Sequence, residues 1–175
     1  MFFRDSTYSV LLVSASEQLN TATAALLPGS EFWPVVTAWS AREARRRLTE
    51  NDYDLVLINA PLPDEFGTKL AADICGKTQA GVLLLVKRDL YEGVYYKVME
   101  EGVLVLPKPT SEAVMSQTLR HLCCMRERLR RAQERQVSVE QKIEEMRILN
   151  RAKWLLIERD GLTEEDAHRT ISRGA

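Results

Sequence analysis

The stretch DLVLINAPLPDEFG, residues 54–67, joins a run of four aliphatic residues, Leu55–Ile58, to a loop that holds two prolines and ends at Gly67. A short aliphatic run bounded by turn residues is typical of a strand that is buried on both faces of a parallel sheet. Open α/β sheets bind their ligands at the carboxyl ends of such strands. The stretch therefore predicts a central strand that is followed by a functional loop.

Four further aliphatic runs flank this stretch and predict the rest of a sheet. They are Val10–Val13, Val35–Thr37, Val82–Val86 and Val103–Leu106. Helical patterns separate the runs, over Glu17–Leu27, Ser40–Asn51, Thr68–Cys75 and Glu92–Glu101. Five strands that alternate with helices predict a five-stranded, doubly wound parallel α/β sheet. Its functional crevice would lie at the strand ends, near Ser14, Ala15, Asn59, Val86 and Lys108.

A long helix is predicted after Pro109, because residues 111–159 contain neither Gly nor Pro. Apolar residues recur there with a heptad spacing. These a and d residues are Leu122, Met125, Leu129, Ala132, Val139, Ile143 and Met146. Such a pattern favours a parallel coiled-coil dimer, with residues 121–146 as the linker helix. The alternative is a single long helix that folds back on its own α/β domain.

Overall composition points to a cytoplasmic protein. The formal charge is −1, and no apolar run approaches the roughly 20 residues that span a bilayer. The aliphatic stretch near the start of the chain is too short for the core of a signal peptide, so we expect no membrane contact. From Arg120 onward, 13 Lys and Arg face 10 Asp and Glu, whereas the rest of the chain holds 11 and 15. A mildly basic end permits contact with nucleic acid without requiring it.

Catalytic and metal-binding patterns are not found in the sequence. Cys75, Cys123 and Cys124 lack metal-ligand spacing, and we expect them to be reduced structural thiols. His121 and His168 lie far apart, without a third ligand at metal spacing. There is no nucleophile–base pair and no Gly-rich phosphate loop. We therefore expect neither an enzyme nor a bound metal or cofactor.

The strand ends of residues 8–122 resemble response-regulator receiver domains, which have a flavodoxin-like fold. The strings that carry the resemblance are YSVLLVSA (8–15), DLVLINAPLPDEFG (54–67) and LPKP (106–109). The resemblance implies a receiver-like domain over residues 1–120. It also implies that Lys108 is the family's lysine and that the Lys108–Pro109 peptide bond is cis, as in such domains.

The resemblance fails at the residues that carry the family's chemistry. Asn59 stands at the phospho-acceptor position, and an amide cannot form an acyl phosphate. Ser14 and Ala15 replace the acidic pair, so the site lacks the hard oxygen ligands of Mg²⁺. Val86 and Val105 replace the usual hydroxyl and aromatic residues. We therefore predict a pseudo-receiver that is not phosphorylated, in which Lys108 hydrogen-bonds Asn59 or a loop carbonyl.

The string ILNRAKWLLIERDGLTEEDA, residues 148–167, resembles the ANTAR module, an RNA-binding unit of transcription antitermination regulators. Gly161 suits the left-handed end of a helix, and Thr163 with Asp166 predicts the start of the next one. The given sequence ends before the family's third helix, so we expect either that the chain is truncated or that residues 147–175 form an incomplete module. Trp154 stands where the family usually has Gly, and we expect its ring to pack rather than to stack on bases.

Basic residues around this string are the candidates for RNA contact. They are Arg147, Arg151, Lys153, Arg159, His168, Arg169 and Arg173. We expect Arg151, Lys153 and Arg169 to share one exposed face, with Lys153 the most important. The resulting hypothesis is a phosphorylation-independent antitermination regulator that acts as a dimer on RNA hairpins. The alternative is a protein-interaction module: a regulatory protein binds the pseudo-receiver, and the helical tail only dimerises.

Overall fold

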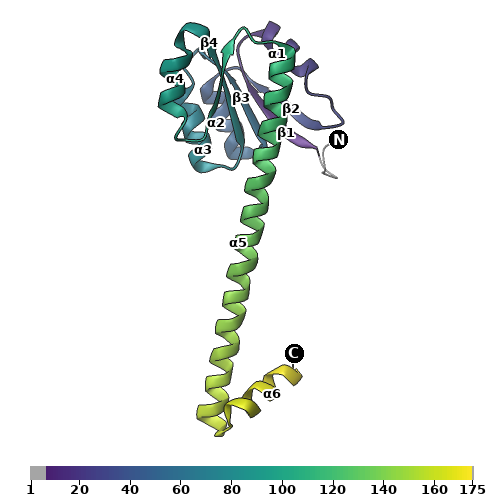
Figure 1. Ribbon diagram of the computed structural model, residues 1–175, viewed down its shortest axis with the longest axis vertical. Helices are drawn as coiled ribbons and strands as arrows, with labels where there is room; N and C mark the ends of the chain where they lie inside the picture. The colour runs from purple at the N-terminus through teal and green to yellow at the C-terminus, as the bar shows by residue number, and fades with distance from the viewer. Residues whose placement is uncertain (1–6, 175) are drawn as a thin grey trace. The chain divides into compact units, whose positions relative to one another are not determined.

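A computed structural model describes the backbone of residues 7–174 and the side chains of residues 7–171 (Figure 1). The five strands are β1 (Tyr8–Val13), β2 (Phe32–Ala38), β3 (Leu55–Asn59), β4 (Gly81–Lys87) and β5 (Leu104–Lys108). The helices are α1 (Glu17–Ala25), α2 (Ala41–Glu50), α3 (Thr68–Lys77), α4 (Tyr91–Val98), α5 (Glu112–Asp160) and α6 (Glu164–Gly174), with a short 3-10 turn, η1 (Arg88–Leu90), before α4.

The strands form one parallel sheet in the order β2-β1-β3-β4-β5. This confirms the predicted five-stranded, doubly wound α/β fold. Two elements differ by three residues at one end from the predictions: β2 begins at Phe32 rather than at Val35, and α4 ends at Val98 rather than at Glu101. The amides of Glu101 and Gly102 bond to the carbonyls of Val98 and Met99, and Gly102 takes a φ of 83°. Glycine adopts this left-handed conformation without the steric cost of a Cβ, so it commonly ends a helix.

Two apolar cores lie on the two faces of the sheet. On one face the sheet packs against α2, α3 and α4, through residues such as Ala44, Leu70 and Val94. On the other face it packs against α1 and the first turns of α5, through Leu19, Met115 and Leu119. Figure 1 shows this division of the helices between the faces. Because both faces are covered, the central residues of the strands form continuous apolar runs, such as Leu55–Ile58 in β3, as their sequences predict.

Leu122 belongs to the second core, and this corrects its assignment to the dimer seam. The side chain is 1% exposed. Its Cδ2 lies 3.1 Å from the position that a Cβ would take on Gly81 of β4. A residue packed so closely on its own sheet is not free to face a second helix. The apolar seam of α5 can therefore begin only at Met125.

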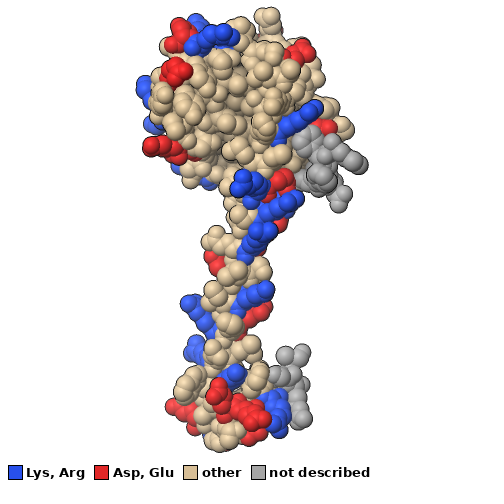
Figure 2. Space-filling model, viewed as in Figure 1, with Lys and Arg blue, Asp and Glu red and all other residues tan. Residues whose placement is uncertain are grey.

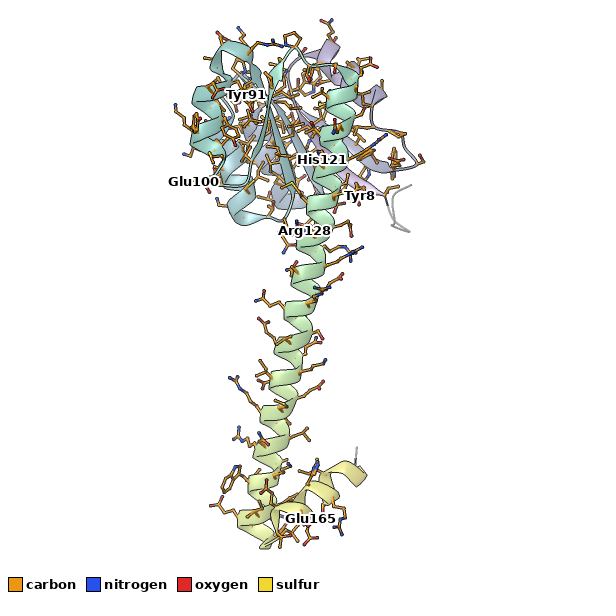
Figure 3. The ribbon with its side chains drawn as sticks, viewed as in Figure 1. Tyr8, Tyr91, Glu100, His121, Arg128 and Glu165 are labelled. Carbon is orange, nitrogen blue, oxygen red and sulfur yellow. The ribbon has the colours of Figure 1, made fainter. Side chains whose placement is uncertain are left out.

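Polar contacts hold α5 to the sheet one turn beyond Leu122. Arg126 Nε lies 3.4 Å from Asp54 Oδ1, and the hydroxyl of Tyr8 lies 3.5 Å from Glu127 Oε1. Figure 3 shows Tyr8 close to the stretch of α5 that carries Arg128. The chain divides into two compact units, which meet at Leu129 and Arg130. Both contacts lie within the first unit.

The second unit consists of α5 from Arg130 onward together with α6. Gly161 takes a φ of 64°, and its N–H bonds to the carbonyl of Ile157, so α5 ends where predicted. Thr163 Oγ1 accepts a hydrogen bond from the Asp166 N–H (3.3 Å) and donates one to Asp166 Oδ2 (2.8 Å), which caps α6 as predicted. Ala167 is fully buried at this junction. No helix in the described part of the chain is both long and apolar enough to cross a bilayer.

Candidate functional site

Three of the predicted site residues meet at the carboxyl end of the sheet. Ser14 follows β1, while Asn59 and Lys108 are the last residues of β3 and β5. Strands β1 and β3 are neighbours, and β4 alone separates β3 from β5. Ala15, the fourth position, adds only an exposed methyl group. The parallel arrangement thus brings together residues that lie up to 94 positions apart in the sequence, as expected for this class of sheet.

A hydrogen-bond network joins these three side chains. Asn59 Nδ2 donates to Ser14 Oγ over 3.1 Å. Lys108 Nζ donates to Asn59 Oδ1 over 2.5 Å and to the backbone carbonyl of Ala60 over 2.6 Å. Ser14 Oγ also accepts from the Ser16 N–H. The prediction that Lys108 bonds Asn59 or a loop carbonyl is confirmed, because it does both.

The network is nearly closed to solvent and holds one cation. Ser14 is 0% exposed and Asn59 is 8% exposed. Burial, followed by the charge of Lys87, lowers the pKa of Lys108 below its ordinary value. No carboxylate of residues 7–171 lies within ion-pair distance of its ammonium. The same part of the chain contains no cluster of three or more His, Cys, Asp or Glu side chains that could hold a metal ion.

The chemistry open to this site is therefore limited. A carboxamide whose nitrogen and oxygen both take part in hydrogen bonds is not a nucleophile towards phosphorus. Neutral Ser14 and Asn59 supply no charge that would draw a divalent cation next to the Lys108 ammonium. Val86 and Val105, at the other two substituted positions, are buried in the core beneath the site. The site thus has the character of a fixed polar network.

Acidic residues of the loop after Asn59, which sequence reasoning missed, fasten this loop to α2. Asp64 accepts hydrogen bonds from the N–H groups of Ala41 and Arg42, both over 2.9 Å. Glu65 accepts from the Leu70 N–H (3.1 Å) and pairs with Arg45 over 2.7 Å. The first turn of every helix has N–H groups without a partner in the helix, and this was the available signal that α2 needs an acceptor. Nothing local in the sequence indicates that the partner lies 22 or 23 residues away.

The candidate RNA-contact residues of α5 do not share one face. Arg151 and Lys153 are two residues apart, and a helix turns about 200° over that step. Arg151 is exposed, whereas Lys153 is half-buried on another side. The expected common face of Arg151, Lys153 and Arg169 is therefore wrong for its first two members. Arg147 lies four residues before Arg151, and Trp154 lies three residues after it. Both therefore share the side of the helix that carries Arg151.

Trp154 is 70% exposed, so the expectation that its ring packs is also wrong. Arg147, Arg151 and Trp154 form an exposed stripe on α5, which we name the Arg-Trp stripe. The side chain of Arg147 is 75% exposed and lies 3.6 Å from Glu144. Arg151 has no hydrogen-bond or ion-pair partner among the described residues. The stripe therefore presents two guanidinium groups and an indole ring to solvent.

Two of the remaining basic candidates, Arg159 and Arg169, lie close to acidic neighbours. Arg159 Nε lies 3.3 Å from Asp160, and Arg169 pairs with Glu165 over 3.2 Å. His168 is exposed on α6. The side chain of Arg173 falls outside the described residues. Figure 2 shows basic and acidic side chains interspersed along α5. These neighbours make Arg159 and Arg169 weaker candidates than Arg151.

The predicted seam residues after Leu122 are all exposed. The five larger ones are between 42% and 59% exposed: Met125, Leu129, Val139, Ile143 and Met146. Ala132 is exposed as well. Nothing in the described chain covers them. They remain available to a partner, so the dimer stays a prediction.

The fold is that of receiver domains in solved structures. The chain aligns with the signal receiver domain of an HD domain-containing protein from Pseudomonas fluorescens Pf-5 (TM-score 0.65, 24% identity, 75% of this chain and 97% of that one). It aligns with an adenylate cyclase structure from Rhodopirellula baltica (0.65, 20%, 74% and 96%) and with the chemotaxis response regulator CheY4 of Vibrio cholerae (0.59, 20%, 67% and 99%).

No family model and no curated protein sequence matches the chain. At these identities the structural likeness establishes the fold alone. The N-terminal unit is therefore a receiver-fold domain whose acceptor position holds Asn59. The Lys108–Pro109 peptide bond is cis, as the resemblance implied.

Proposed function

We propose that this chain is a non-enzymatic signalling protein of the response-regulator type that works without phosphorylation, and that it binds RNA hairpins as a dimer to regulate transcription antitermination. The receiver fold supports the signalling role. The neutral network of Ser14 and Asn59 supports independence from phosphorylation, because it offers neither an acceptor carboxylate nor a site for Mg²⁺.

The Arg-Trp stripe is the observation that favours RNA. Guanidinium groups contact phosphate, and aromatic rings stack on bases that a hairpin loop leaves unpaired. A stacked base contributes about 1–3 kcal/mol to such binding. Trp154 is 70% exposed beside these arginines, so its ring is accessible to an unpaired base. Among the described residues, Arg151 has no acidic partner that an RNA phosphate would need to displace.

Dimerisation would place two stripes on one particle. The exposed apolar seam of α5 offers a surface that an identical helix covers well. In a parallel pair, Arg135 at g lies opposite Glu140 at e of the second copy, which is attractive. Lys142 lies opposite Arg147, which is not. Two RNA-contact surfaces held together raise affinity for two neighbouring hairpins through effective concentration.

The test uses the whole chain and an RNA of two identical hairpins joined by a short linker, with the blunt stem duplex as control. Replacing the exposed Trp154 by Ala should weaken hairpin binding roughly 5- to 150-fold, the range that stacking energies imply. Helicity should be kept, because Ala is the better helix former. Binding to the duplex, which offers no unpaired base, should change little.

Arg151→Ala and Lys153→Ala form a matched pair on opposite sides of α5. Arg151→Ala should lower the slope of log affinity against log salt by about 0.7–0.9, which corresponds to one lost phosphate contact. Lys153→Ala should leave the slope unchanged. If the parent binds no hairpin at low salt, or if Trp154→Ala and Arg151→Ala bind as tightly as the parent, the protein-interaction function becomes the better one.

A further inference from the structure

A groove of about 520 Å³ lies between α1 and the beginning of α5, next to Lys108. Figure 1 shows α1 and the first turns of α5 on the same face of the sheet. The volume lies within the range of roughly 300–1,000 Å³ that small-molecule sites occupy. All of the lining residues belong to the receiver-fold unit. The Arg-Trp stripe belongs to the other unit, so the groove plays no part in the RNA proposal.

The walls of the groove are mostly apolar. Leu19, Ala22 and Leu26 come from α1, Leu85 comes from β4, and Met115 comes from α5. Leu19 and Leu26 are only half-buried, so part of their surface faces the groove. An apolar ligand body of a few carbon atoms would bind here favourably, because it removes apolar surface of both the ligand and the groove from water.

One end of the groove is positive. Lys108 lines it, and its ammonium has three donors, of which Asn59 and Ala60 take two. Thr110 and Ser111 add hydroxyl groups at the same end. Helix α5 begins there, so the partial positive charge of its first N–H groups adds to that of Lys108. Glu112 is the acidic member of the lining, and it is exposed to solvent.

We propose that this groove binds a small organic carboxylate, with its apolar body between α1 and α5 and its carboxylate at the end formed by Lys108 and Ser111. The positive charge of Lys108 favours an anionic ligand. The Asn59 amide cannot neutralise the half-buried ammonium as a carboxylate would, and a ligand carboxylate supplies the missing negative charge. The binding site would give a domain without a phospho-acceptor a different chemical input.

The experiment compares octanoate with 1-octanol, which has the same chain length but no charge, in titrations of the ¹⁵N-labelled full chain followed by NMR. Octanoate should shift the amide signals of Leu19, Ala22 and Met115, and should bind at least about tenfold more tightly than octanol, since a charge-assisted contact contributes about 1.5–3 kcal/mol. Lys108→Gln should remove this preference, whereas Lys87→Gln should keep it.

A second variant tests whether the probes bind in the groove or at other apolar surfaces. Ala22 is exposed on α1, so Ala22→Phe fills the groove without entering the core. It should abolish binding of both probes while the remaining amide spectrum stays that of a folded chain. The proposal is overturned if octanoate causes no saturable shift at millimolar concentration. It is equally overturned if the shifts map to the exposed seam of α5, or if Ala22→Phe and Lys108→Gln bind octanoate as the parent does.

Discussion

The ammonium of Lys108 donates a hydrogen bond to the side-chain oxygen of Asn59, at the position where the receiver resemblance places a phospho-accepting aspartate. The amide also donates to Ser14, so both of its polar atoms take part in the network. A phosphoryl group on this side chain would require a carboxylate and would have to break these bonds. Lys108 thus keeps its position beside residue 59, but the phosphorylation chemistry that it would assist is lost.

The domain should not accept a phosphoryl group. After incubation of the chain with acetyl phosphate and Mg²⁺, intact mass measurement should show no adduct. Asn59→Asp alone should also fail, because Ser14 and Ala15 leave the metal without ligands. The triple variant that adds Ser14→Asp and Ala15→Asp is the positive control and should gain an adduct. An adduct on the parent that disappears in Asn59→Ala would refute the pseudo-receiver interpretation.

Substitutions of Leu122 and Leu129 should differ strongly in their effect on stability, although these residues are equivalent a positions one heptad apart. Leu122 is 1% exposed, so Leu122→Ala should lower the free energy of unfolding of the receiver-fold unit by about 2–5 kcal/mol. Leu129 is 52% exposed, and Leu129→Ala should change it by less than about 0.5 kcal/mol. Urea denaturation followed by far-UV circular dichroism measures both. Equal losses would mean that Leu129 is also part of the core.

The exposed seam should hold a dimer together. Changing Leu129 and Ile143 together to Asp would place charges in the interface, where their burial is costly. Sedimentation equilibrium should then report a monomer, and the urea midpoint of the receiver-fold unit should be kept. Val137→Asp, at an exposed position outside the seam, is the control and should remain dimeric. A parent chain that is already monomeric at tens of micromolar would contradict the prediction.

Asp64 should give the domain a pH-dependent stability. Hydrogen bonds from the backbone N–H of Arg42 and then of Ala41 lower the pKa of Asp64 below its ordinary value of 3.8. A lowered carboxyl pKa stabilises the folded state above 3.8, and this stability is lost as the pH falls through the folded-state pKa. Asp64→Ala should cost about 0.5–2 kcal/mol at neutral pH, as other lost helix caps do.

The advantage of the parent over Asp64→Ala should shrink below pH 3.8 in urea titrations. Asp64→Asn keeps an oxygen acceptor but cannot titrate, so it should show no such decline relative to Asp64→Ala. If the parent's advantage is the same at acidic and neutral pH, the carboxylate does not cap α2 in solution.

The fold and its altered site were open to prediction because both depend on local pattern. Continuous aliphatic runs such as Leu55–Ile58 identify buried parallel strands, and the turn residues between runs separate them. The first or second residue after a run then lies at the functional edge of the sheet, so Ser14, Asn59 and Lys108 could be placed together. Helix geometry alone also places Arg151 and Lys153 on opposite sides of α5. The expectation that they share one face was therefore wrong already at the level of the sequence.

By itself, the sequence determined the doubly wound sheet, the loss of the acceptor carboxylate at Asn59 and the helix end at Gly161, because short-range pattern and residue chemistry decide these features. Only the tertiary structure decided that Leu122 is core while Leu129 is surface, that Asp64 caps α2, and that α1 and α5 leave a groove beside Lys108. Equivalent heptad positions look alike in sequence. Their burial depends on where the sheet ends beneath the helix, which is a property of the packed chain and not of any local stretch.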